Sequence, residues 1–340
     1  MIKTDIIIIG AGPVGLFTIF EAGLRKLHCH VIDAIPQVGG QLKEIYPKKP
    51  IYDIPGFPSV LAGDLIDNIE KQAEPFQPGF TLGERAESIE KQSDGTFVVT
   101  TNEGTQHQAP TVIIAGGLGS FEPRKPLVEN LEKFEKKGIE YMVREPELLL
   151  NKRLFISGGG DSALDWAIYF AENSELPLGL VHRSDMFRAH KDSVDRVYQL
   201  QEKGKIELYT HAEIKKVDGD QVLESIELHQ KDREPKKINV DYWLPLFGLS
   251  PKLGPIGDWG LEIEKNAIKV DHTLDYQTNT PGIFAVGDVN TYPGKLKLIL
   301  CGFHEATLAV QSCYKIINPD KKFNMKYTTV QGVQGFEKVV

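Results

Sequence analysis

The spacing of glycines near the N-terminus is typical of a site that binds the phosphates of a dinucleotide. Gly10, Gly12 and Gly15 form a G-x-G-x-x-G pattern directly after the apolar run of residues 5–9. Glycines allow a tight turn and a close approach of the backbone to a pyrophosphate, whose charge is stabilised by the N-terminus of the following helix. Asp33 lies 18 residues after Gly15, where a carboxylate can bind ribose hydroxyls. We therefore predict a first nucleotide site here.

A second glycine pattern begins at Gly158. It runs through Gly160 to Asp161, Ser162 and Ala163, with alanine at the third position, as the dinucleotide fingerprint permits. Because this pattern also follows an apolar strand-like run, we predict a second nucleotide site on the same chain.

The charge after the next strand differs between the two sites. The strand-like residues 178–182 end in His182, and Arg183 and Arg188 follow, where the first site has Asp33. A carboxylate would repel a 2′-phosphate, whereas a guanidinium binds it with paired, charge-assisted hydrogen bonds. The second site therefore favours NADPH over NADH. The alternative interpretation is that both arginines are solvated surface groups.

The same order of elements surrounds both glycine patterns. In each, a short apolar run predicts a buried parallel strand, helical spacing of apolar residues follows, and a second strand pattern ends the unit. Pro13, which begins the first helical stretch, is also a candidate cofactor contact. The expected elements are residues 5–10, 13–26 and 28–33 in the first unit, and 153–158, a helix through about 171, and 178–182 in the second.

Further strand patterns predict a small antiparallel sheet beside each unit. Residues 96–101 and 105–115 are rich in β-formers around a turn, and residues 221–230 and 237–244 repeat the arrangement. Residues 297–317 read as a long helix.

Two more strands end in glycine, which lets a backbone approach a cofactor. Gly116 follows the first of them, and Gly287 with Asp288 follows the second. Taken singly, each is more often a plain turn; beside two fingerprints they become candidate cofactor contacts.

Composition excludes several classes of protein. The 340 residues are 41% hydrophobic and 25% charged, which are globular averages and leave room for two domains. No apolar run approaches the roughly 20 residues that a membrane helix needs, and Met1 does not open a secretory signal, so we expect a cytoplasmic protein without a membrane partner. The net charge of −8 argues against nucleic acid as a partner. Three separated cysteines suggest neither disulfides nor a metal site.

Several longer strings are more specific than the glycine patterns. With the four glycine-containing elements in this order, the chain resembles the two-dinucleotide-domain flavoprotein reductases over nearly its whole length. Within them it is most similar to the thioredoxin-reductase-like ferredoxin(flavodoxin)–NADP reductases. The strings that carry this second resemblance are residues 39–42 (GGQL), 46–47 (YP), 52–53 (YD), 158–163 (GGGDSA) and 291–298 (TYPGKLKL).

The resemblance implies a fold and its domain boundaries. The expected fold class is α/β, with two Rossmann-like dinucleotide-binding domains of the three-layer ββα type, each with a small antiparallel sheet. Residues 1–116 and 247–340 would form a discontinuous FAD-binding domain whose C-terminal tail lies over the flavin. Residues 117–246 would form the NADPH-binding domain, and the protein would be a homodimer.

The resemblance also implies which residues line the FAD site and which act on the flavin. Tyr46 and Tyr327 are expected to stack on the flavin, and Asp288 to bind its ribityl chain. Because Tyr327 would then lie where the nicotinamide must stack, we expect the C-terminal tail to move, or the domains to rotate, during turnover. The further FAD contacts implied are Asp33, Gly40, Gln41, Ala86, Phe121 and Thr329.

The activity follows from one departure from thioredoxin reductases. Those proteins carry a Cys-x-x-Cys pair where this chain has cysteine-free residues 138–144, so no dithiol can reduce a disulfide. We therefore expect a ferredoxin- or flavodoxin–NADP reductase, which moves a hydride between NADPH and FAD and single electrons to the carrier. The chemistry is the flavin's, so no catalytic dyad is predicted. Two alternatives stay open: an oxidase or diaphorase acting on oxygen, free flavin or a quinone, and a non-enzymatic redox sensor.

Acidic carriers would need a local positive patch on this acidic chain. The lysines near the predicted flavin mouth could form it or could be plain solvated groups. These candidates are Lys295, Lys297, Lys321, Lys322 and Lys326. In addition, relatives usually carry His-Arg-Arg where this chain has Ser184 after Arg183, which weakens the expected preference for NADPH.

Overall fold

The computed structural model describes residues 1–143, 145–321 and 328–337, without the side chains of residues 120–122, 249–251 and 331. It divides the chain into two compact units, Met1–Ser120 with Pro251–Val340, and Phe121–Ser250. The divisions between these units follow residues 120 and 250. The chain passes between the units in β11 (Ser120–Pro123) and β19 (Leu249–Lys252), which pair with each other.

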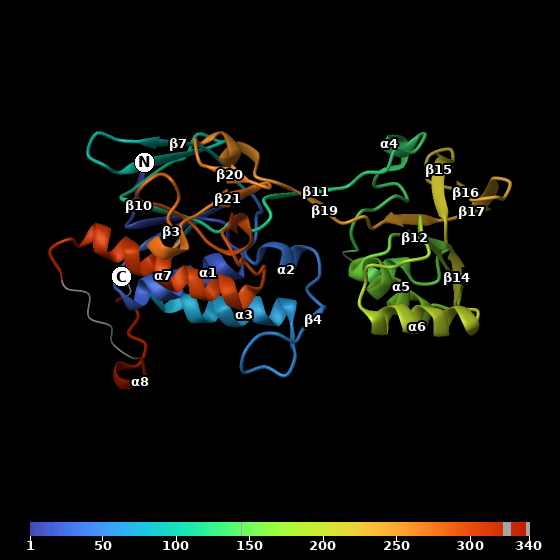
Figure 1. The fold of residues 1–340 in the computed structure, drawn as a ribbon, viewed down its shortest axis with the longest axis horizontal. Coiled ribbons are helices and arrows are strands. Elements are labelled where there is room, and N and C mark those ends of the chain that lie inside the picture. The colour runs from blue at the N-terminus through green and yellow to red at the C-terminus, as the bar shows by residue number, and fades with distance from the viewer. Residues whose placement is uncertain (144, 322–327, 338–340) are drawn as a thin grey trace. The chain divides into compact units, whose positions relative to one another are not determined.

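A five-stranded sheet forms the centre of the first unit. Its order is β22-β10-β2-β3-β6, and every neighbouring pair is parallel. Three helices, α1, α3 and α7, lie together as a layer along this sheet (Figure 1). The strands are β2 (Ile6–Ile9), β3 (Cys29–Asp33), β6 (Gly79–Leu82), β10 (Thr111–Ile114) and β22 (Ile283–Ala285), and the helices are α1 (Pro13–Leu24), α3 (Ala62–Ala73) and α7 (Ile299–Ile317).

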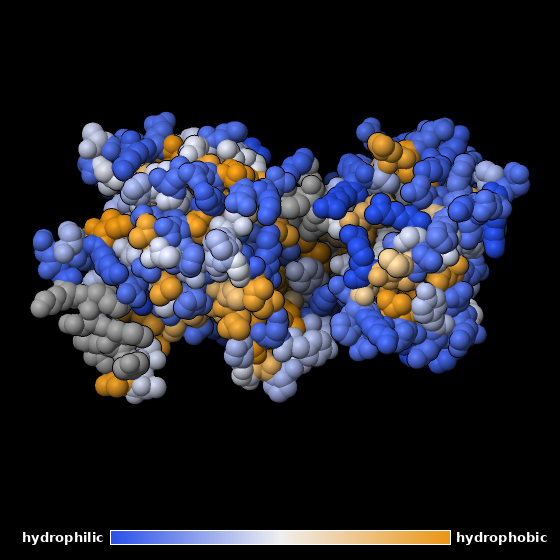
Figure 2. Space-filling model, in the orientation of Figure 1, coloured by the Kyte–Doolittle hydropathy of each residue, from blue (hydrophilic) through white to orange (hydrophobic). Residues whose placement is uncertain are grey.

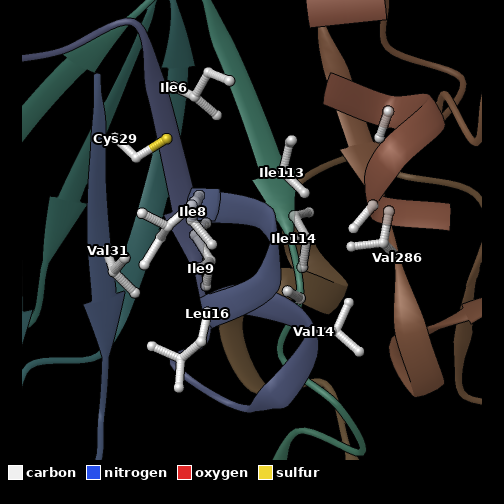
Figure 3. Close-up of a cluster of buried hydrophobic side chains, with 14 of the residues drawn as sticks. Ile6, Ile8, Ile9, Val14, Leu16, Cys29, Val31, Ile113, Ile114 and Val286 are labelled. Carbon is white, nitrogen blue, oxygen red and sulfur yellow. The ribbon is translucent and has the colours of Figure 1, made fainter. Parts of the chain in front are cut away.

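The core of the first unit lies between this sheet and its helices. All four residues of β2 are buried, as expected of a parallel strand covered on both faces. Figure 3 shows the branched side chains of β2, β3 and β10 with Val14 and Leu16 of α1 and with Val286, which directly follows β22. This packing fixes the position of the loop between β2 and α1.

A smaller sheet of order β1-β9-β8-β7 forms a third layer on this unit. β7 and β9 both pair with β8 in antiparallel fashion. The expected single stretch of residues 105–115 is wrong, because Pro110 separates β9 from β10, and these two strands belong to different sheets. Proline has no N–H to donate to a sheet. The bounds are β1 (Ile2–Lys3), β7 (Ala86–Lys91), β8 (Phe97–Thr101) and β9 (Gln106–Ala109).

Short elements complete the first unit. β20 and β21 pair in antiparallel fashion, β21 pairs with β23 in parallel, and β4 pairs with β5. Their bounds, with those of the short helices, are α2 (Gly40–Glu44), β4 (Pro50–Ile51), β5 (Val60–Leu61), η1 (Glu74–Phe76), η3 (Gly254–Asp258), β20 (Ile263–Glu264), β21 (Ala267–Lys269), η4 (His272–Leu274), η5 (Gly287–Val289), β23 (Asn290–Thr291) and α8 (Thr328–Gln331).

The second unit repeats the parallel arrangement with four strands. Their order is β14-β13-β12-β18, all parallel, and α5 packs against α6. The bounds are β12 (Leu154–Ser157), α5 (Asp161–Asn173), β13 (Leu178–Val181), α6 (Lys191–Glu202), β14 (Ile206–Tyr209) and β18 (Tyr242–Pro245), with α4 (Leu131–Phe134) and η2 (Pro146–Leu149) before them.

A three-stranded antiparallel sheet accompanies this second unit. It consists of β15 (Ala212–Asp218), β16 (Ser225–Gln230) and β17 (Lys236–Asn239). The strand pattern at residues 221–230 found β16 but missed β15, whose alternation of buried and exposed residues is interrupted by a bulge between Ile214 and Lys216.

Candidate cofactor sites

The first glycine loop, between β2 and α1, is closely packed on one side and open on the other. A Cβ on Gly10, whose φ is 110°, would lie 2.5 Å from the carbonyl oxygen of Ala115. A Cβ on Gly15 would lie 1.9 Å from the carbonyl oxygen of Gly10, so only glycine lets α1 approach the strand this closely. At Gly12, just before Pro13 opens α1, no described atom lies within 4 Å of the Cβ position. This open side, beside the first turn of a helix, fits a pyrophosphate.

Asp33, the last residue of β3, is bonded to that loop. Its carboxylate accepts hydrogen bonds from the N–H groups of Ala11, at 2.6 Å, and Ile35, at 2.8 Å. Burial raises the pKa of Asp33, and the two hydrogen bonds oppose that rise. The Ala11 carbonyl accepts from the N–H of Gly39 at 2.8 Å. The side chain of Asp33 is partly exposed, so it can still accept hydrogen bonds from ribose hydroxyls.

The segment around α2 approaches the same loop. A Cβ on Gly40, whose φ is 54°, would lie 3.2 Å from the Cα of Gly12. The Tyr46 hydroxyl donates to Oε1 of Gln41 at 3.4 Å. Burial raises the pKa of Tyr46, and the negative charge of Asp288 raises it further. The structure therefore brings Tyr46 into the electrostatic range of Asp288, far apart in sequence.

Asp288 lies in η5, directly after β22. The preceding Gly287 has a φ of 78°, and a Cβ there would lie 3.3 Å from Cγ2 of Val14 on α1. A Cβ on Gly302 of α7 would lie 2.5 Å from the same Val14 atom. These close approaches hold η5 between the two helices, and burial raises the pKa of the Asp288 carboxyl. The predicted grouping of the glycine loop with Asp288 is thus present in the structure.

Other predicted FAD residues differ in their placement. Gly116 lies two residues after the end of β10, and its Cβ position, like that of Gly12, has no described atom within 4 Å. Ala86 is buried at the start of β7, opposite Thr101. The side chain of Phe121 and the whole of Tyr327 lie outside the described residues.

Thr329 is the prediction that the structure does not support. It lies in α8, which is well separated from α2 and its Gly40 and Gln41 (Figure 1). Beyond α8, the Phe336 ring stacks on His28 at 4.2 Å between centroids, and its N–H donates to the Pro75 carbonyl at 2.8 Å. His28 immediately precedes β3, at the opposite end of that strand from Asp33. These described tail residues therefore do not lie over the first glycine loop of their own chain.

A buried carboxylate that the sequence patterns missed lies against Gly287. The side chain of Glu305 on α7 is 0% exposed, and its Oε2 accepts from the Gly287 N–H at 2.7 Å and the Asn290 amide at 2.9 Å. Its Oε1 accepts from the Tyr292 hydroxyl at 2.9 Å and from Nζ of Lys295 at 2.5 Å. The sequence signal that could have revealed this carboxylate was an acidic residue within the apolar pattern of the predicted helix at residues 297–317.

Lys295 is therefore not a surface lysine. Its side chain is only 5% exposed, because it pairs with Glu305, and its Nζ lies 5.5 Å from the centroid of the Tyr292 ring. The expectation that Lys295 helps to form a docking patch is wrong. Lys297 and Lys321 are exposed, whereas Lys322 and Lys326 lie outside the described residues.

The second glycine loop, between β12 and α5, has the same two-sided packing. A Cβ on Gly158 would lie 2.6 Å from that of the buried Ala163, and a Cβ on Gly159 would lie 2.1 Å from Cε1 of His182. At Gly160, no described atom lies within 4 Å of the Cβ position. Asp161 and Ser162 then open α5 with exposed side chains. This loop also offers an open side beside a helix N-terminus.

Residues 182–190 fold back onto that loop. The His182 ring stacks on Phe187 at 4.8 Å, and its Nε2 lies 3.1 Å from the Met186 carbonyl oxygen. Burial lowers the pKa of His182. The ring is buried beneath Gly159, so His182 positions the loop rather than presenting a nitrogen to a nucleotide. The predicted contact by His182 is thus replaced by a packing role.

The two arginines of this segment are exposed and close to the glycine loop. The Arg188 N–H donates to the Gly159 carbonyl at 2.7 Å, and the Asp161 carboxylate accepts from the His190 N–H at 2.8 Å. The charges of Arg183 and Arg188 both act on the buried His182. Neither arginine forms an ion pair within the part of the chain that the structure describes. Two guanidinium groups thus remain available for an anion.

Two other features, metal sites and membrane-spanning helices, are absent from the described ranges. No group of three or more His, Cys, Asp or Glu side chains there is arranged to hold a metal ion. Within the same ranges, no helix has the length and apolar character needed to cross a membrane. On the face in Figure 2, hydrophobic residues form separate patches interrupted by hydrophilic surface.

Comparisons with known proteins agree with this geometry. The sequence profile of the pyridine nucleotide-disulphide oxidoreductase family matches residues 4–311, so the chain belongs to this family of redox enzymes. A "Ferredoxin--NADP reductase" of Flavobacterium johnsoniae is 64% identical over 337 residues, covering 99% of this chain and 96% of that protein. "Ferredoxin--NADP reductase 1" of Christiangramia forsetii is 62% identical over 339 residues, with the same coverage of each chain.

Solved structures support the fold. Thioredoxin reductase of Lactococcus lactis superposes with a TM-score of 0.78 at 23% identity, covering 93% of this chain and 100% of its own. The thioredoxin reductase of T. acidophilum gives a TM-score of 0.77 at 22% identity, covering 93% of this chain and 99% of its own. The predicted α/β class, with two Rossmann-like units and small antiparallel sheets, is confirmed.

Proposed function

We propose that the chain is an FAD-dependent reductase that moves electrons between NADPH and a small carrier protein, a ferredoxin or a flavodoxin. The observation that carries the proposal is the presence of two glycine loops, one beside an acidic residue and one beside basic residues, on a chain without a Cys-x-x-Cys pair. The first loop is bonded to Asp33, and the second lies beside Arg183 and Arg188. The names of the relatives that are 62–64% identical support the same activity.

The first unit is proposed to hold FAD. Open space at the Cβ positions of Gly12 and Gly116 can admit a ligand that approaches the backbone closely. The partly exposed carboxylates of Asp33 and Asp288 can accept hydrogen bonds from hydroxyls of the ligand, and Tyr46 offers a half-buried aromatic ring beside them. In this proposal residues 1–116 and 247–340 form the FAD-binding domain.

Residues 117–246 are proposed to bind NADPH. The open side at Gly160 suits the pyrophosphate, and Arg183 and Arg188 can bind a 2′-phosphate through paired hydrogen bonds. Ser184 cannot add a third cation, and its hydroxyl donates to the Met186 carbonyl at 3.1 Å. Two arginines therefore carry the preference over NADH.

When bound, the flavin supplies the conversion between two-electron and one-electron transfer. The side chains described above bind and orient the two nucleotides, and the chain has no Cys-x-x-Cys pair to pass electrons on. Cys29 and Cys313 are buried, and burial raises the pKa of both thiols, so neither is a ready thiolate. Electrons must then leave the flavin for an external acceptor.

An acidic carrier requires a local positive surface on this chain of net charge −8. After the exclusion of Lys295, the exposed Lys297 and Lys321 are the described candidates. We expect carrier reduction to slow as ionic strength rises, because exposed charges are screened over about 10 Å at 0.1 M salt. The homodimer stays a prediction, which sedimentation of the purified protein would test.

The test is to purify the protein, record its flavin spectrum, and follow oxidation of NADPH and of NADH with and without ferredoxin or flavodoxin. Carrier-dependent oxidation with NADPH preferred is the expected result. Equal oxidation without carrier would instead support an oxidase or diaphorase. Bound flavin with no reduction of any carrier would support a redox sensor, and a colourless protein that cannot be loaded with FAD would contradict the proposal as a whole.

A further inference from the structure

Glu305 organises the segment between β22 and α7 through an unusual set of bonds. Its carboxylate accepts from two backbone or amide donors in residues 287–290, from a phenol hydroxyl at Tyr292 and from an ammonium at Lys295. The Asn290 amide also donates to the Ala285 carbonyl at 2.7 Å, which connects the same carboxylate to the end of β22. One fully buried side chain thus determines the path of residues 285–295.

Burial makes the charge on Glu305 consequential. A buried carboxylate is stable only if it is paired and hydrogen-bonded, and removal of one partner leaves the other charge uncompensated. Here the partner is Lys295, which is also almost fully buried. By contrast, a second ion pair of α7, between Lys315 and Asp275 at 3.9 Å, is partly exposed and should contribute little.

The position of this pair is what relates it to cofactor chemistry. Gly287, the first donor to Glu305, directly precedes Asp288 and lies close to Val14 of α1, the helix that follows the first glycine loop. Burial raises the pKa of Asp288, Lys295 and Lys297 oppose the rise, and Glu305 adds to it. The two members of the Glu305–Lys295 pair therefore have opposite effects on the pKa of Asp288, at the site proposed for FAD.

We propose that Glu305 is a positioning residue for the flavin: it fixes Gly287 and Asp288 in place and, by holding Lys295, keeps the charge beside the flavin balanced. The inference rests on the proposed binding of FAD at this site. It assigns the buried pair a role in the flavin's redox balance, beyond that of a structural link.

If the pair has this role, substitution of its members should shift the flavin midpoint potential in a pattern that a purely structural role would not produce. Glu305→Gln keeps the size of the side chain and an oxygen that can accept from Gly287, but leaves Lys295 as an uncompensated cation. A cation stabilises the more negative, reduced flavin, so the midpoint potential should rise. Lys295→Met leaves the carboxylate unpaired, and the potential should fall. The double variant has neither charge, so its potential should return close to that of the wild type.

The experiment measures the flavin midpoint potential and the FAD dissociation constant of the wild type, the two single variants and the double variant. Lys315→Met is the matched control on α7. We expect each single variant to change the ratio of affinities for reduced and oxidised FAD about tenfold, equivalent to about 30 mV for a two-electron couple. Both single variants should also bind FAD more weakly. Lys315→Met should change neither quantity.

Three outcomes would overturn the inference: single variants with the wild-type potential, two single variants whose potentials shift in the same direction, or a double variant that does not return. If Glu305→Gln does not fold, Lys295→Met and the charge-free double variant still give the comparison. A wild-type protein that binds no FAD would instead contradict the proposed function, so the two failures can be distinguished.

Discussion

The N–H of Ala11 donates a 2.6 Å hydrogen bond to the carboxylate of Asp33, which joins the first glycine loop to the end of the neighbouring strand. The second unit has no equivalent carboxylate at the end of β13, where His182 and Arg183 follow the strand. There the glycine loop is held instead by packing against His182 and by the bond from Arg188 to Gly159. Thus the strand that completes the strand–loop–helix unit is followed by basic residues in the second unit, whereas in the first it ends in the acidic Asp33.

Asp33→Asn should weaken FAD binding without lowering the stability of the apoprotein. Because burial raises the pKa of Asp33, its ionised form opposes folding at neutral pH, and this unfavourable contribution disappears as the pH falls through the folded-state pKa. Asn removes this charge but has only one oxygen to accept from Ala11 and Ile35, so we expect the apoprotein of the variant to melt at about the same temperature at pH 7. The FAD dissociation constant should rise about tenfold to a hundredfold, since hydrogen bonds to charged groups contribute about 1.5–3 kcal/mol. Flavin fluorescence and thermal unfolding would measure both, with the exposed Asp53→Asn as control.

Substitutions within the first glycine loop should have contrasting effects. Gly15→Ala would place a Cβ 1.9 Å from the Gly10 carbonyl oxygen, so we expect a poorly folded protein. Gly12→Ala meets no described atom within 4 Å and has an extended backbone with φ −72°. The Gly12 variant should therefore keep the melting temperature of the apoprotein while losing FAD affinity, because its methyl group occupies the space proposed for the pyrophosphate. Wild-type FAD affinity in this variant would show that the cofactor lies elsewhere.

Removal of Arg183 or Arg188 should change the choice of nicotinamide coenzyme. Each guanidinium bound to a 2′-phosphate is expected to contribute roughly 1.5–3 kcal/mol, so each alanine variant should raise the KM for NADPH about tenfold to a hundredfold. The KM for NADH should stay unchanged, since NADH has no 2′-phosphate. Arg233→Ala, at another exposed position of the same unit, is the matched control. If both coenzymes weaken equally, the arginines do not recognise the 2′-phosphate.

A buried histidine pair should make the first unit sensitive to acid. Nε2 of His30 lies 2.8 Å from the Thr81 hydroxyl oxygen, which lies 2.9 Å from Nε2 of His107. Burial, with a further contribution from His107, lowers the pKa of His30 from 6.5 to about 4. The unfolded chain therefore binds the proton more readily, and the stability that neutral His30 provides above pH 6.5 is lost as the pH falls towards about 4.

The acid effect can be measured as the pH dependence of the free energy of unfolding. His30 should account for up to about 3 kcal/mol of the loss, at 1.36 kcal/mol for each pKa unit. His30→Gln should make the profile between pH 6.5 and 4 flatter. The exposed His304→Gln is the control and should leave the profile as it is. A His30 variant with the wild-type pH profile would contradict the prediction.

The sequence predicted what local rules determine. The run of residues 6–9, the glycines after it and Asp33 fall within one short stretch, and periodicity with turn chemistry is sufficient to assign them. Lys295 was misjudged because a lysine in a loop is normally solvated, and its burial depends on its pairing with Glu305 of α7, a buried carboxylate that no local pattern specified. Pro110 is a local signal that divides residues 105–115 into two strands, but the assignment of these strands to different sheets depends on partners elsewhere along the chain. Thr329 was assigned by resemblance alone, and no local pattern specified the position of α8.

The two-part composition of the first unit has a consequence for synthesis on the ribosome. Residues 121–250 are contiguous, so that unit can complete its sheet as soon as it has emerged. The sheet of the first unit cannot, because β10 waits for its neighbour β22, residues 283–285, and the hydrogen bond from the Gly287 N–H to Glu305 forms later still. Contacts between such distant segments slow folding and leave an edge strand unpaired in the nascent chain. We therefore expect the unit that begins at the N-terminus to be the last to become native, and its exposed sheet edge to be a place where chaperones are needed.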